Sequence, residues 1–306
     1  MISMVDYILG AESDQFTENL SRLCGVEAKW VKIRLFPDSE VCPRIQNPEG
    51  LKGASVVLVF RAESGRIAPS RYLMLYYLTA MNLKEHGVSE VIAVIPYLPY
   101  CRQDKRFLPG EPVSLRYVAQ LLEASGVDCI VTVSSHVMGT ETPLQDYFSV
   151  PAIDLDGFKP LAEYLKSMGR SYSNAVVIAP DEKSLRWAEE VRMEINAARA
   201  MYIKKTRDLV TGEISITAPG EDLSGLEVII VDDIASTGGT LVRAASYARS
   251  RGASRISLCF IHPVLIGEAL PKLVAASDEV IATDTIRSEV SRATVTKLVA
   301  STLSRI

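Results

Sequence analysis

Short apolar runs rich in β-branched residues recur along the chain, and they place the strongest constraint on what it can fold into. Runs of this length without polar alternation are typical of strands in a parallel sheet that is covered on both faces. Segments with a helical pattern lie between the runs, and this alternation predicts a doubly wound α/β fold. The expected strands are Ala54–Phe60, Val88–Ile95, Val127–Val133, Ala175–Ile178, Glu227–Val231 and Arg255–Phe260. The expected helices are Ser70–Glu85, Ser114–Ala124, Glu182–Ala197 and Thr240–Ser250.

The length of the chain, 306 residues, predicts about two domains at roughly 150 residues each. A loop-like stretch at Ser149–Asp156 is the expected boundary. We therefore predict an N-terminal domain at residues 1–152 and a C-terminal domain at residues 153–306. Within the second domain, Asp208–Ile216 is expected to form an inserted β-hairpin with Thr211-Gly212 at its turn.

A local phrase occurs three times, at Gly87, Gly126 and Gly252, where each glycine follows an expected helix and leads into an expected strand. Glycine is favoured just past a helix because the backbone there takes the left-handed conformation. The second and third phrases each reach a histidine ten residues after the glycine, at His136 and His262. The parallel suggests two related α/β halves, although helix–glycine–strand junctions also look alike without any common origin.

Composition and charge argue against several classes of protein. The chain has 33 Lys and Arg residues against 37 Asp and Glu residues, a net charge of −4, so a surface devoted to nucleic acid or anionic lipid is not expected. No apolar run approaches the roughly 18 residues of a membrane span, and no basic region precedes the first apolar stretch as in a secretory signal. The five cysteines are scattered without zinc-finger or redox spacing, and a cytoplasmic location is expected.

The segment Val228–Thr240 carries the strongest chemical signal in the chain. An apolar strand ends in Asp232 and Asp233, and a Ser-Thr-Gly-Gly-Thr loop at residues 236–240 then opens a helix. Glycines allow main-chain N–H groups to approach a phosphate, hydroxyls add donors, and a helix N-terminus adds partial positive charge. The two acids would repel that phosphate, but they suit sugar hydroxyls or a neighbouring Mg²⁺. The pattern predicts a sugar-phosphate site; a capped strand–helix turn is the structural alternative.

A basic cluster in the first half is the second chemical signal. Arg102, Lys105 and Arg106 lie close together in a loop that is expected to leave a strand, and such a cluster suits a polyphosphate. Gln103, beside Arg102, adds a group that can hold phosphate, base or ribose. A solvated surface turn is the alternative interpretation of this cluster.

Together these motifs resemble those of a known family. Residues 228–240 resemble the ribose-phosphate loop of the type I phosphoribosyltransferase-like fold, which phosphoribosyltransferases share with ribose-phosphate diphosphokinases. The first half favours the diphosphokinases, because Phe36-Pro-Asp-Ser-Glu40 resembles their FPDGE segment. Residues 96–107, PYLPYCRQDKRF, resemble their PYxxYxRQDRRF segment, and Gly110–Ser114 continues the match. The resemblance runs over nearly the whole chain and is nearest to the short archaeal-type synthetases of phosphoribosyl pyrophosphate (PRPP).

The resemblance implies a Mg²⁺-dependent transfer of the diphosphoryl group of ATP to ribose 5-phosphate, which gives PRPP and AMP. It implies a homo-oligomer, because in this family the Phe36–Glu40 loop reaches the ATP site of a neighbouring subunit. It also implies that most ATP-binding segments lie in the N-terminal domain, and that the ribose-phosphate loop and a catalytic Lys and Arg lie in the C-terminal domain. The implied ATP-binding residues are Phe36, Asp38, Glu40, Arg102 and Gln103, and the implied catalytic residues are Lys205 and Arg207. The implied ribose 5-phosphate site comprises Arg207, Asp232, Asp233, Ser236, Thr237, Gly238, Gly239 and Thr240, and the implied metal ligands are His136 and Asp181.

Three departures from the family pattern keep other interpretations open. The glycine of FPDGE is Ser39, an acid often found two residues before the histidine is Ser134, and the stretch after Pro180-Asp181 is Glu182-Lys-Ser-Leu. These departures allow a catalytically silent paralogue that regulates an active synthetase. The loop at residues 236–240, taken alone, would also suit a phosphoribosyltransferase that uses PRPP and a nucleobase.

Individual site residues also have structural alternatives. A lone histidine such as His136 is often structural rather than metal-binding. Asp181 could cap the helix expected to begin near Glu182. The basic segment Lys204–Arg207 could be an exposed turn, but Lys205 and Arg207 suit a reaction in which the negative charge of a transferring diphosphoryl group must be stabilised.

Overall fold

The computed structural model describes residues 5–64, 68–207, 214–217 and 221–306. Its contacts divide the chain into two compact units. Unit 1 comprises Met1–Ala62, Arg66–Asp156 and Val295–Ile306, and unit 2 comprises Glu63–Gly65 and Gly157–Thr294. The last segment of the chain therefore belongs with unit 1, while the assignment of separate functions to residues 1–152 and 153–306 stays a prediction.

Unit 1 is built on a seven-stranded sheet with the order β3-β2-β1-β4-β6-β7-β8. All neighbouring strands are parallel except β2 and β3, which form an antiparallel hairpin. Strands β4 and β7 are buried along their whole length, as the apolar runs predict. The strands are β1 (Tyr7–Ala11), β2 (Glu27–Leu35), β3 (Val41–Ile45), β4 (Ser55–Val59), β6 (Glu90–Ile95), β7 (Cys129–Val133) and β8 (Ala152–Leu155).

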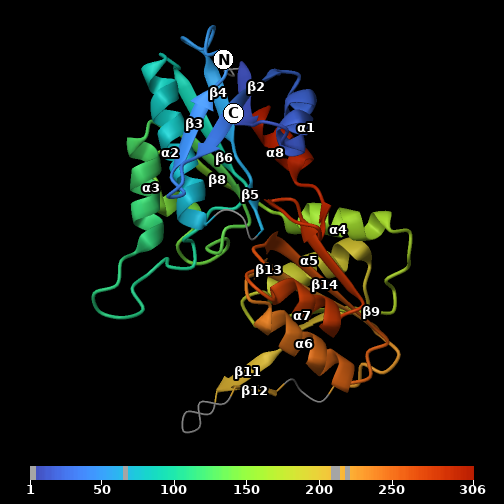
Figure 1. The fold of residues 1–306 in the computed structure, drawn as a ribbon. Helices are drawn as coiled ribbons and strands as arrows, with labels where there is room; N and C mark the ends of the chain where they lie inside the picture. Colours follow the sequence, from blue (N-terminus) through green and yellow to red (C-terminus); the bar gives the residue numbers. More distant parts are fainter. Residues whose placement is uncertain (1–4, 65–67, 208–213, 218–220) are drawn as a thin grey trace. The chain divides into compact units, whose positions relative to one another are not determined.

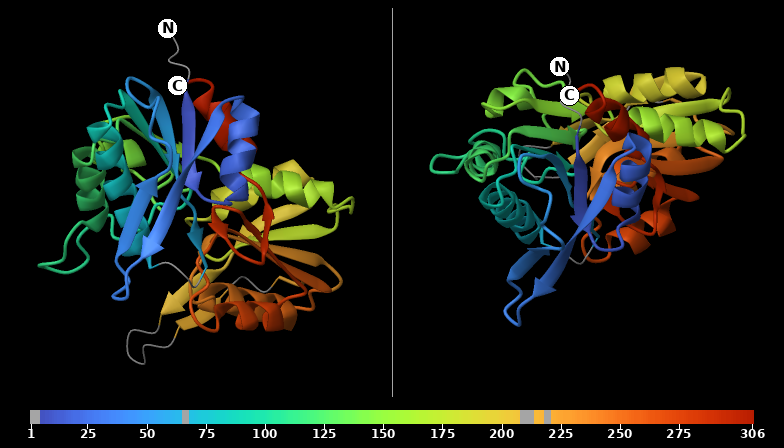
Figure 2. Two further views of the ribbon diagram at one scale, coloured as in Figure 1. Left: turned by 45° about the horizontal axis from the view of Figure 1, so that its top comes forward. Right: turned by 90° about the horizontal axis from the view of Figure 1, so that it is seen from above.

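Helices cover both faces of this sheet. Helices α1 (Gln15–Cys24) and α8 (Thr296–Leu303) lie together on one face, and α2 (Pro69–Glu85) and α3 (Ser114–Ala124) lie on the other (Figure 1). Figure 2 shows the same layering from two further directions. A short 3₁₀ helix, η1 (Leu144–Tyr147), precedes β8.

Unit 2 contains a six-stranded sheet in which every neighbouring pair is parallel, with the order β10-β9-β13-β14-β15-β17. Helices α4 (Phe158–Ser167) and α5 (Leu185–Ile195) cover one face, and α6 (Gly239–Ser250) and α7 (Ala269–Ala276) cover the other (Figure 1). The strands are β9 (Ala175–Ala179), β10 (Arg199–Tyr202), β13 (Glu227–Ala235), β14 (Arg255–Pro263), β15 (Glu279–Thr283) and β17 (Ser291–Ala293). Two short pairs are separate from it: β5 (Ala62–Glu63) with β16 (Ile286–Arg287), and β11 (Lys204–Arg207) with β12 (Ile214–Thr217).

The parallel strands of both units follow one topology. Numbered along the chain within each unit, their spatial order is second, first, third, fourth, fifth and sixth, and the connection reverses direction beside the first strand. This confirms the predicted fold class of two related doubly wound α/β domains with mainly parallel sheets. Strands β11 and β12 pair antiparallel on either side of the predicted hairpin turn, but Thr211-Gly212 itself lies outside the described residues.

The proposed correspondence between the two histidines is wrong. His136 follows β7, the fifth parallel strand of unit 1, whereas His262 lies within β14, the fourth parallel strand of unit 2. The phrase that begins at Gly87 leads into β6, which is the fourth strand of unit 1 and the true counterpart of β14. The two strands begin at the same distance from their glycines, but β7 has five residues and β14 has nine. The equal spacing of ten residues therefore reaches the turn after β7 in one case and the interior of β14 in the other.

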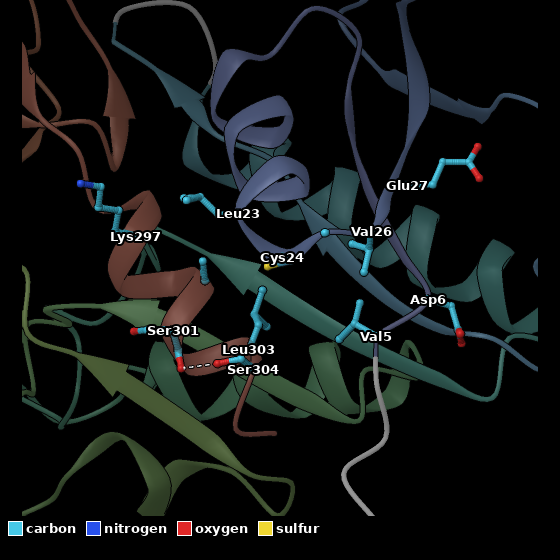
Figure 3. Close-up of a pocket in the computed structure, with 12 residues that line it drawn as sticks. Val5, Asp6, Leu23, Cys24, Val26, Glu27, Lys297, Ser301, Leu303 and Ser304 are labelled. Carbon is cyan, nitrogen blue, oxygen red and sulfur yellow. Dashed lines mark hydrogen bonds between the residues drawn. The ribbon is translucent and has the colours of Figure 1, made fainter.

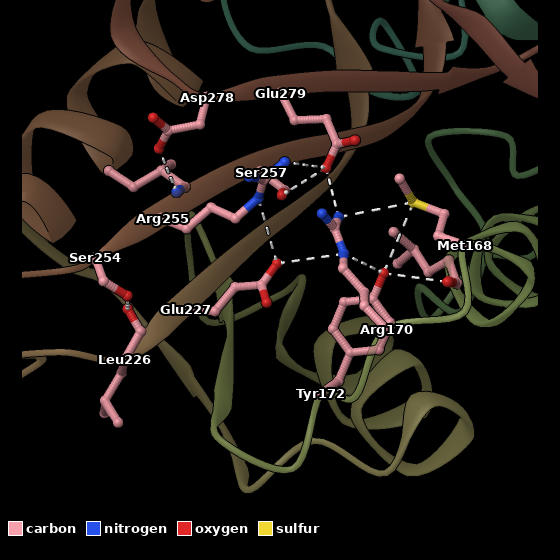
Figure 4. A network of polar contacts seen from close by, with 12 residues as sticks. Met168, Arg170, Tyr172, Leu226, Glu227, Ser254, Arg255, Ser257, Asp278 and Glu279 are labelled. Carbon is pink, nitrogen blue, oxygen red and sulfur yellow. Dashed lines mark hydrogen bonds and ion pairs between the residues drawn. The ribbon is translucent and has the colours of Figure 1, made fainter.

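A network of charged groups joins the starts of three strands in unit 2 (Figure 4). Glu227 begins β13, Arg255 begins β14 and Glu279 begins β15. Arg170 lies among them: its Nη2 is 2.5 Å from Glu279 Oε2, and its Nε is 3.7 Å from Glu227 Oε1. Arg255 contacts the same two carboxylates at 3.8 and 3.6 Å. The two arginines therefore keep two partly buried acids together at the amino-terminal edge of the sheet.

Arg170→Met should lower the free energy of unfolding by about 1–2 kcal/mol at pH 7, because two partly dehydrated acids would remain close together. Burial is the largest single influence on Glu279 and raises its pKa, but the hydrogen bond and charge of Arg170, the hydrogen bond from Ser257 and the charge of Arg255 together hold that pKa below its usual value of 4.5. An acid with a lowered pKa stabilises the fold above its unfolded-state value and loses that contribution as the pH falls through the folded-state value. The difference in free energy of unfolding between Arg170→Met and wild type, measured by urea unfolding, should therefore become smaller as the pH falls below 4.5.

Lys166→Met is the matched control, because Lys166 pairs with Glu194 at 2.9 Å while both side chains are about half exposed. Its cost should be below about 0.5 kcal/mol. Equal stabilities for the two variants would contradict the role given to Arg170.

Candidate active site

The phosphate loop, residues 236–240, connects the end of β13 to the start of α6. Ser236 and Thr240 are half-buried, Thr237 is exposed, and Gly238 is buried with φ +75°. A Cβ atom at Gly238 would lie 3.2 Å from Leu273 of α7, so both the backbone conformation and the packing favour glycine. No side chain caps the N-terminus of α6, and the first N–H groups of this helix have no carbonyl partner within the helix. These features would allow the loop to accept a phosphate, and that role stays a prediction.

Three acids gather at the same edge of the unit 2 sheet. Asp232 and Asp233 are buried near the end of β13, and Asp181 follows the neighbouring strand β9. Burial raises the pKa of Asp232 well above its usual value, and the negative charges of Asp233 and Asp181 raise it further. A bound group that donates hydrogen bonds to the carboxylates, such as a sugar hydroxyl, or a hydrated cation would relieve this repulsion.

The expected capping role of Asp181 is not found, because α5 begins at Leu185 with Ser184 as its N-cap residue and without a side-chain cap. Asp181 instead fixes the turn that precedes this helix. Its Oδ1 accepts hydrogen bonds from Ser184 N at 3.1 Å and from Ser184 Oγ at 3.0 Å, just before α5. This contact uses one carboxylate oxygen, so the support of the turn and a role toward a cation are compatible. Asp181 therefore fixes the loop after β9 while it faces the acids of β13.

The carboxylates of Asp181, Asp232 and Asp233 are oxygen ligands of the kind that Mg²⁺ prefers, but they do not form a complete coordination site by themselves. Within the part of the chain that the structure describes, no group of three or more His, Cys, Asp and Glu side chains is arranged to hold a metal ion. Mg²⁺ commonly keeps several waters and binds one or two carboxylates together with substrate phosphates. The carboxylates of unit 2 fit such a mode.

Lys205 and Arg207 lie in β11, two residues apart, directly after the buried Ile203. Their main-chain partners in β12 are Ile216 and Ile214. The basic segment is therefore a strand of a hairpin rather than a turn. The side chains of both residues lie outside what the structure describes, and their catalytic roles stay predictions.

The β2–β3 hairpin in unit 1 carries Phe36, Asp38 and Glu40, all of them exposed. Phe36 N–H donates to Glu40 O at 2.9 Å, and Glu40 N–H donates to Asp38 Oδ1 at 3.2 Å. The guanidinium of Arg34 lies 4.6 Å from the centre of the Phe36 ring. Ser39, which replaces the family glycine, has φ +74°, so it takes the left-handed conformation that a glycine would take without strain.

The loop that follows β6 is organised by Glu111, a residue that sequence analysis did not single out. Glu111 Oε2 accepts hydrogen bonds from Leu108 N–H at 3.0 Å, Phe107 N–H at 3.1 Å and Gln103 Nε2 at 3.2 Å. These donors, led by Leu108 N–H, lower the pKa of Glu111. Its position in the Gly110–Ser114 match to the family was the signal that could have identified it.

The two predicted ATP-binding residues of this loop differ in their surroundings. Arg102 is exposed, whereas Gln103 is half-buried and its Nε2 also lies 3.1 Å from Lys105 O. The amide group of Gln103 thus braces the loop that presents Arg102.

His136 is exposed in the turn after β7. The preceding residues are fixed: Ser134 N–H donates to Leu155 O at 2.7 Å, and Ser135 N–H and Oγ donate to the carboxylate of Asp154 at 3.0 and 2.5 Å. Asp154 of β8 is a second residue that sequence analysis missed, and it holds the turn that carries His136. The metal-binding role of His136 stays a prediction.

The structure gathers part of the predicted site within each unit. Asp181, Asp232, Asp233 and the phosphate loop share one edge of the unit 2 sheet, whereas His136, Arg102 and Gln103 follow neighbouring strands of unit 1. A groove of about 740 Å³ in unit 1 lies elsewhere, between α8 and the residues around the end of α1 (Figure 3). Cys24, Glu27, Lys297 and Ser301 are among the residues that line it, and none of the predicted site residues is. In the described segments, the structure shows no helix with the length and apolar character of a membrane span.

A phosphate loop and an acidic pair after a central strand of a doubly wound sheet define an α/β protein of the phosphoribosyltransferase type. Residues 155–286 match the family model of the phosphoribosyl transferase domain. Residues 5–126 match the model of the N-terminal domain of ribose phosphate pyrophosphokinase.

Relatives extend this match over most of the chain. The chain is 39% identical over 275 residues to a ribose-phosphate pyrophosphokinase of Methanothermobacter thermautotrophicus, covering 89% of this chain and 90% of that one. It is 35% identical to a ribose-phosphate pyrophosphokinase of Aeropyrum pernix, covering 87% and 83% of the two chains. The crystal structure of phosphoribosylpyrophosphate synthetase from Mycobacterium smegmatis superposes with a TM-score of 0.82 at 26% identity, over 97% of both chains. The chain belongs to the ribose-phosphate pyrophosphokinase family, and this confirms the family predicted from the motifs.

Ser39→Gly should raise the free energy of unfolding by about 0.5–1 kcal/mol, because it removes the strain of a left-handed serine at a small cost in chain entropy. Asp38→Gly, one residue away, should lower it, because it removes the hydrogen bond to Glu40 N–H. Urea unfolding of both variants measures the two signs. A destabilised Ser39→Gly variant would show that the hairpin does not keep this backbone conformation.

Proposed function

We propose that the chain transfers the β,γ-diphosphoryl group of ATP to the anomeric hydroxyl of ribose 5-phosphate, giving PRPP and AMP. The observation that carries this proposal is the family match across both halves of the chain, in the order that the synthetases have. A phosphoribosyltransferase would account for the second half alone.

Ribose 5-phosphate would bind at the edge of the unit 2 sheet. Main-chain N–H groups at the start of α6 and the hydroxyls of Ser236, Thr237 and Thr240 would hold the 5-phosphate. Asp232 and Asp233 would accept hydrogen bonds from the ribose hydroxyls, which removes part of the cost of keeping two buried carboxylates together.

ATP would bind through the unit 1 residues Phe36, Asp38, Glu40, Arg102 and Gln103. The exposed guanidinium of Arg102 suits the polyphosphate, and the Phe36 ring, already stacked on Arg34, suits the adenine. The family implies that the Phe36–Glu40 segment completes the site of a neighbouring subunit, so the working form would be a homo-oligomer.

His136 and Asp181 would each be a ligand of Mg²⁺, together with substrate oxygens. When bound, it would neutralise charge on the phosphates of ATP. On the side of the site that would bind ribose 5-phosphate, hydrogen bonds from Ser184 hold the Asp181 carboxylate in place.

In the transfer, the oxygen of the anomeric hydroxyl forms a bond to the β-phosphorus while the bond from that phosphorus to the α-phosphate oxygen breaks. The hydroxyl proton is lost and AMP leaves with the bonding electrons. Lys205 and Arg207 would stabilise the negative charge that develops on the moving diphosphoryl group. We also place the activity in the cytoplasm, with small-molecule substrates and no nucleic acid or membrane as partners.

The direct test is product analysis with Mg²⁺, ATP and ribose 5-phosphate. Stoichiometric PRPP and AMP are expected. Formation of ADP would contradict diphosphoryl transfer, and base-dependent release of pyrophosphate from PRPP would favour a phosphoribosyltransferase. Binding of both substrates without turnover would identify a silent paralogue, for which Ser39, Ser134 and Glu182-Lys183-Ser184 are the departures to examine.

Two substitutions should separate chemistry from binding. Lys205→Ala should lower kcat by on the order of 10²–10³, because it removes a charge that acts mainly in the transition state. Thr237→Val should mainly raise the KM for ribose 5-phosphate, because it removes one exposed hydroxyl from the phosphate loop.

Lys204→Ala and Thr237→Ser are the matched controls, and both should remain close to wild type in steady-state kinetics. An intact kcat in Lys205→Ala, or weaker ATP binding in Thr237→Val, would overturn this division of roles.

A further inference from the structure

A segment between β14 and α7 lies directly against the phosphate loop of unit 2. Leu265 N–H donates to Ala235 O at 2.9 Å, and Ile266 N–H donates to Ser236 O at 2.9 Å. The bonds extend the pairing of β13 with β14 past Ala235 and Pro263, where the regular ladder ends. The first two peptide groups of the connection into the phosphate loop are therefore held from one side.

Because the peptide bond is planar, fixing the carbonyl groups of Ala235 and Ser236 also fixes the direction of the N–H groups that follow them. In a trans peptide the C=O of one residue and the N–H of the next point in opposite directions. Because Ala235 O and Ser236 O point toward residues 265 and 266, the N–H groups of Ser236 and Thr237 point away from them. The N–H groups of Ser236 and Thr237 thus have a fixed direction before a ligand binds. Pre-orientation of this kind reduces the conformational entropy lost on binding.

The supporting segment is itself held in a strained conformation. Leu265 has φ +50° although its side chain is 6% exposed and belongs to the core of unit 2. Such a conformation is unfavourable for a leucine and persists only where the surroundings enforce it. The neighbouring Ile266 side chain is 59% exposed, so its main-chain N–H, and not its packing, connects it to the phosphate loop.

We propose that residues 264–266 are a positioning segment that sets the affinity of the phosphate loop for the phosphate group of ribose 5-phosphate. This inference rests on the proposed function, because it assigns that ligand to the loop. Leu265 and Ile266 act through Ala235 and Ser236, and they make no contact with the substrate themselves.

The test replaces Ile266 by its α-hydroxy acid, so that an ester oxygen takes the place of the N–H donor while the side chain is kept. The KM for ribose 5-phosphate should rise about three- to tenfold, the loss expected for one hydrogen bond. The KM for ATP and kcat should stay within about twofold of wild type. Ile266→Ala, which keeps the N–H and removes the exposed side chain, is the control and should match wild type.

Leu265→Gly provides a second variant, because it keeps both donors but frees the strained backbone. It should also raise the KM for ribose 5-phosphate selectively. A lower kcat with unchanged KM values in both variants would indicate only a loss of folded protein and would overturn the inference.

Calorimetric titration of ribose 5-phosphate separates this inference from the proposed function. Weaker binding by the ester variant would support the positioning role even if the wild type forms no AMP, a result that would defeat the proposed function alone. Equal binding by the ester variant and the wild type, or no binding by the wild type, would overturn the positioning role.

Discussion

The parallel main-chain pairing of β13 with β9 on one side and with β14 on the other is the interaction on which the candidate site depends. Parallel strands end at the same edge of a sheet, so the residues that follow each strand are brought together there. Strand β9 contributes Asp181, β13 contributes Asp232 and the phosphate loop, and the end of β14 contributes the segment that supports this loop. Main-chain pairing thus brings the acids and the loop at residues 236–240 to one edge of the sheet.

Local patterns predicted the central strands and the phosphate loop, because their signals are continuous in the sequence. Strands buried on both faces, such as β4 and β7, have sequences that are nearly unbroken apolar runs. Strand β2 is mostly half-buried or exposed and has no such run. The role of Glu111 was not predictable in the same way, because its donors converge only after the loop folds. Likewise, nothing in the local pattern of α8 reveals that it packs with α1 at the other end of the chain.

The two units use the same topology but carry different charged groups at the place where the strand order reverses. In unit 1, Asp14 follows β1 and Arg61 follows β4, and their charged groups lie 2.5 Å apart with little exposure. Asp14 also accepts from Thr17 N–H at the start of α1, so the charges there stabilise the fold. In unit 2, the corresponding edge carries Asp181 and Asp232, whose repulsion contributes to the raised pKa of Asp232. One copy of the topology pairs opposite charges at this edge, whereas the other gathers acids there.

The return of α8 to unit 1 has a consequence for the order in which the protein is made. Residues 295–306 leave the ribosome after every strand of unit 2, yet they cover the same face of the unit 1 sheet as α1. During synthesis, part of the apolar surface of unit 1 therefore stays uncovered until unit 2 and residues 295–306 have left the ribosome. A nascent chain arrested at residue 156 would carry the whole sheet of unit 1 but lack this cover, and it would be the species most in need of a chaperone.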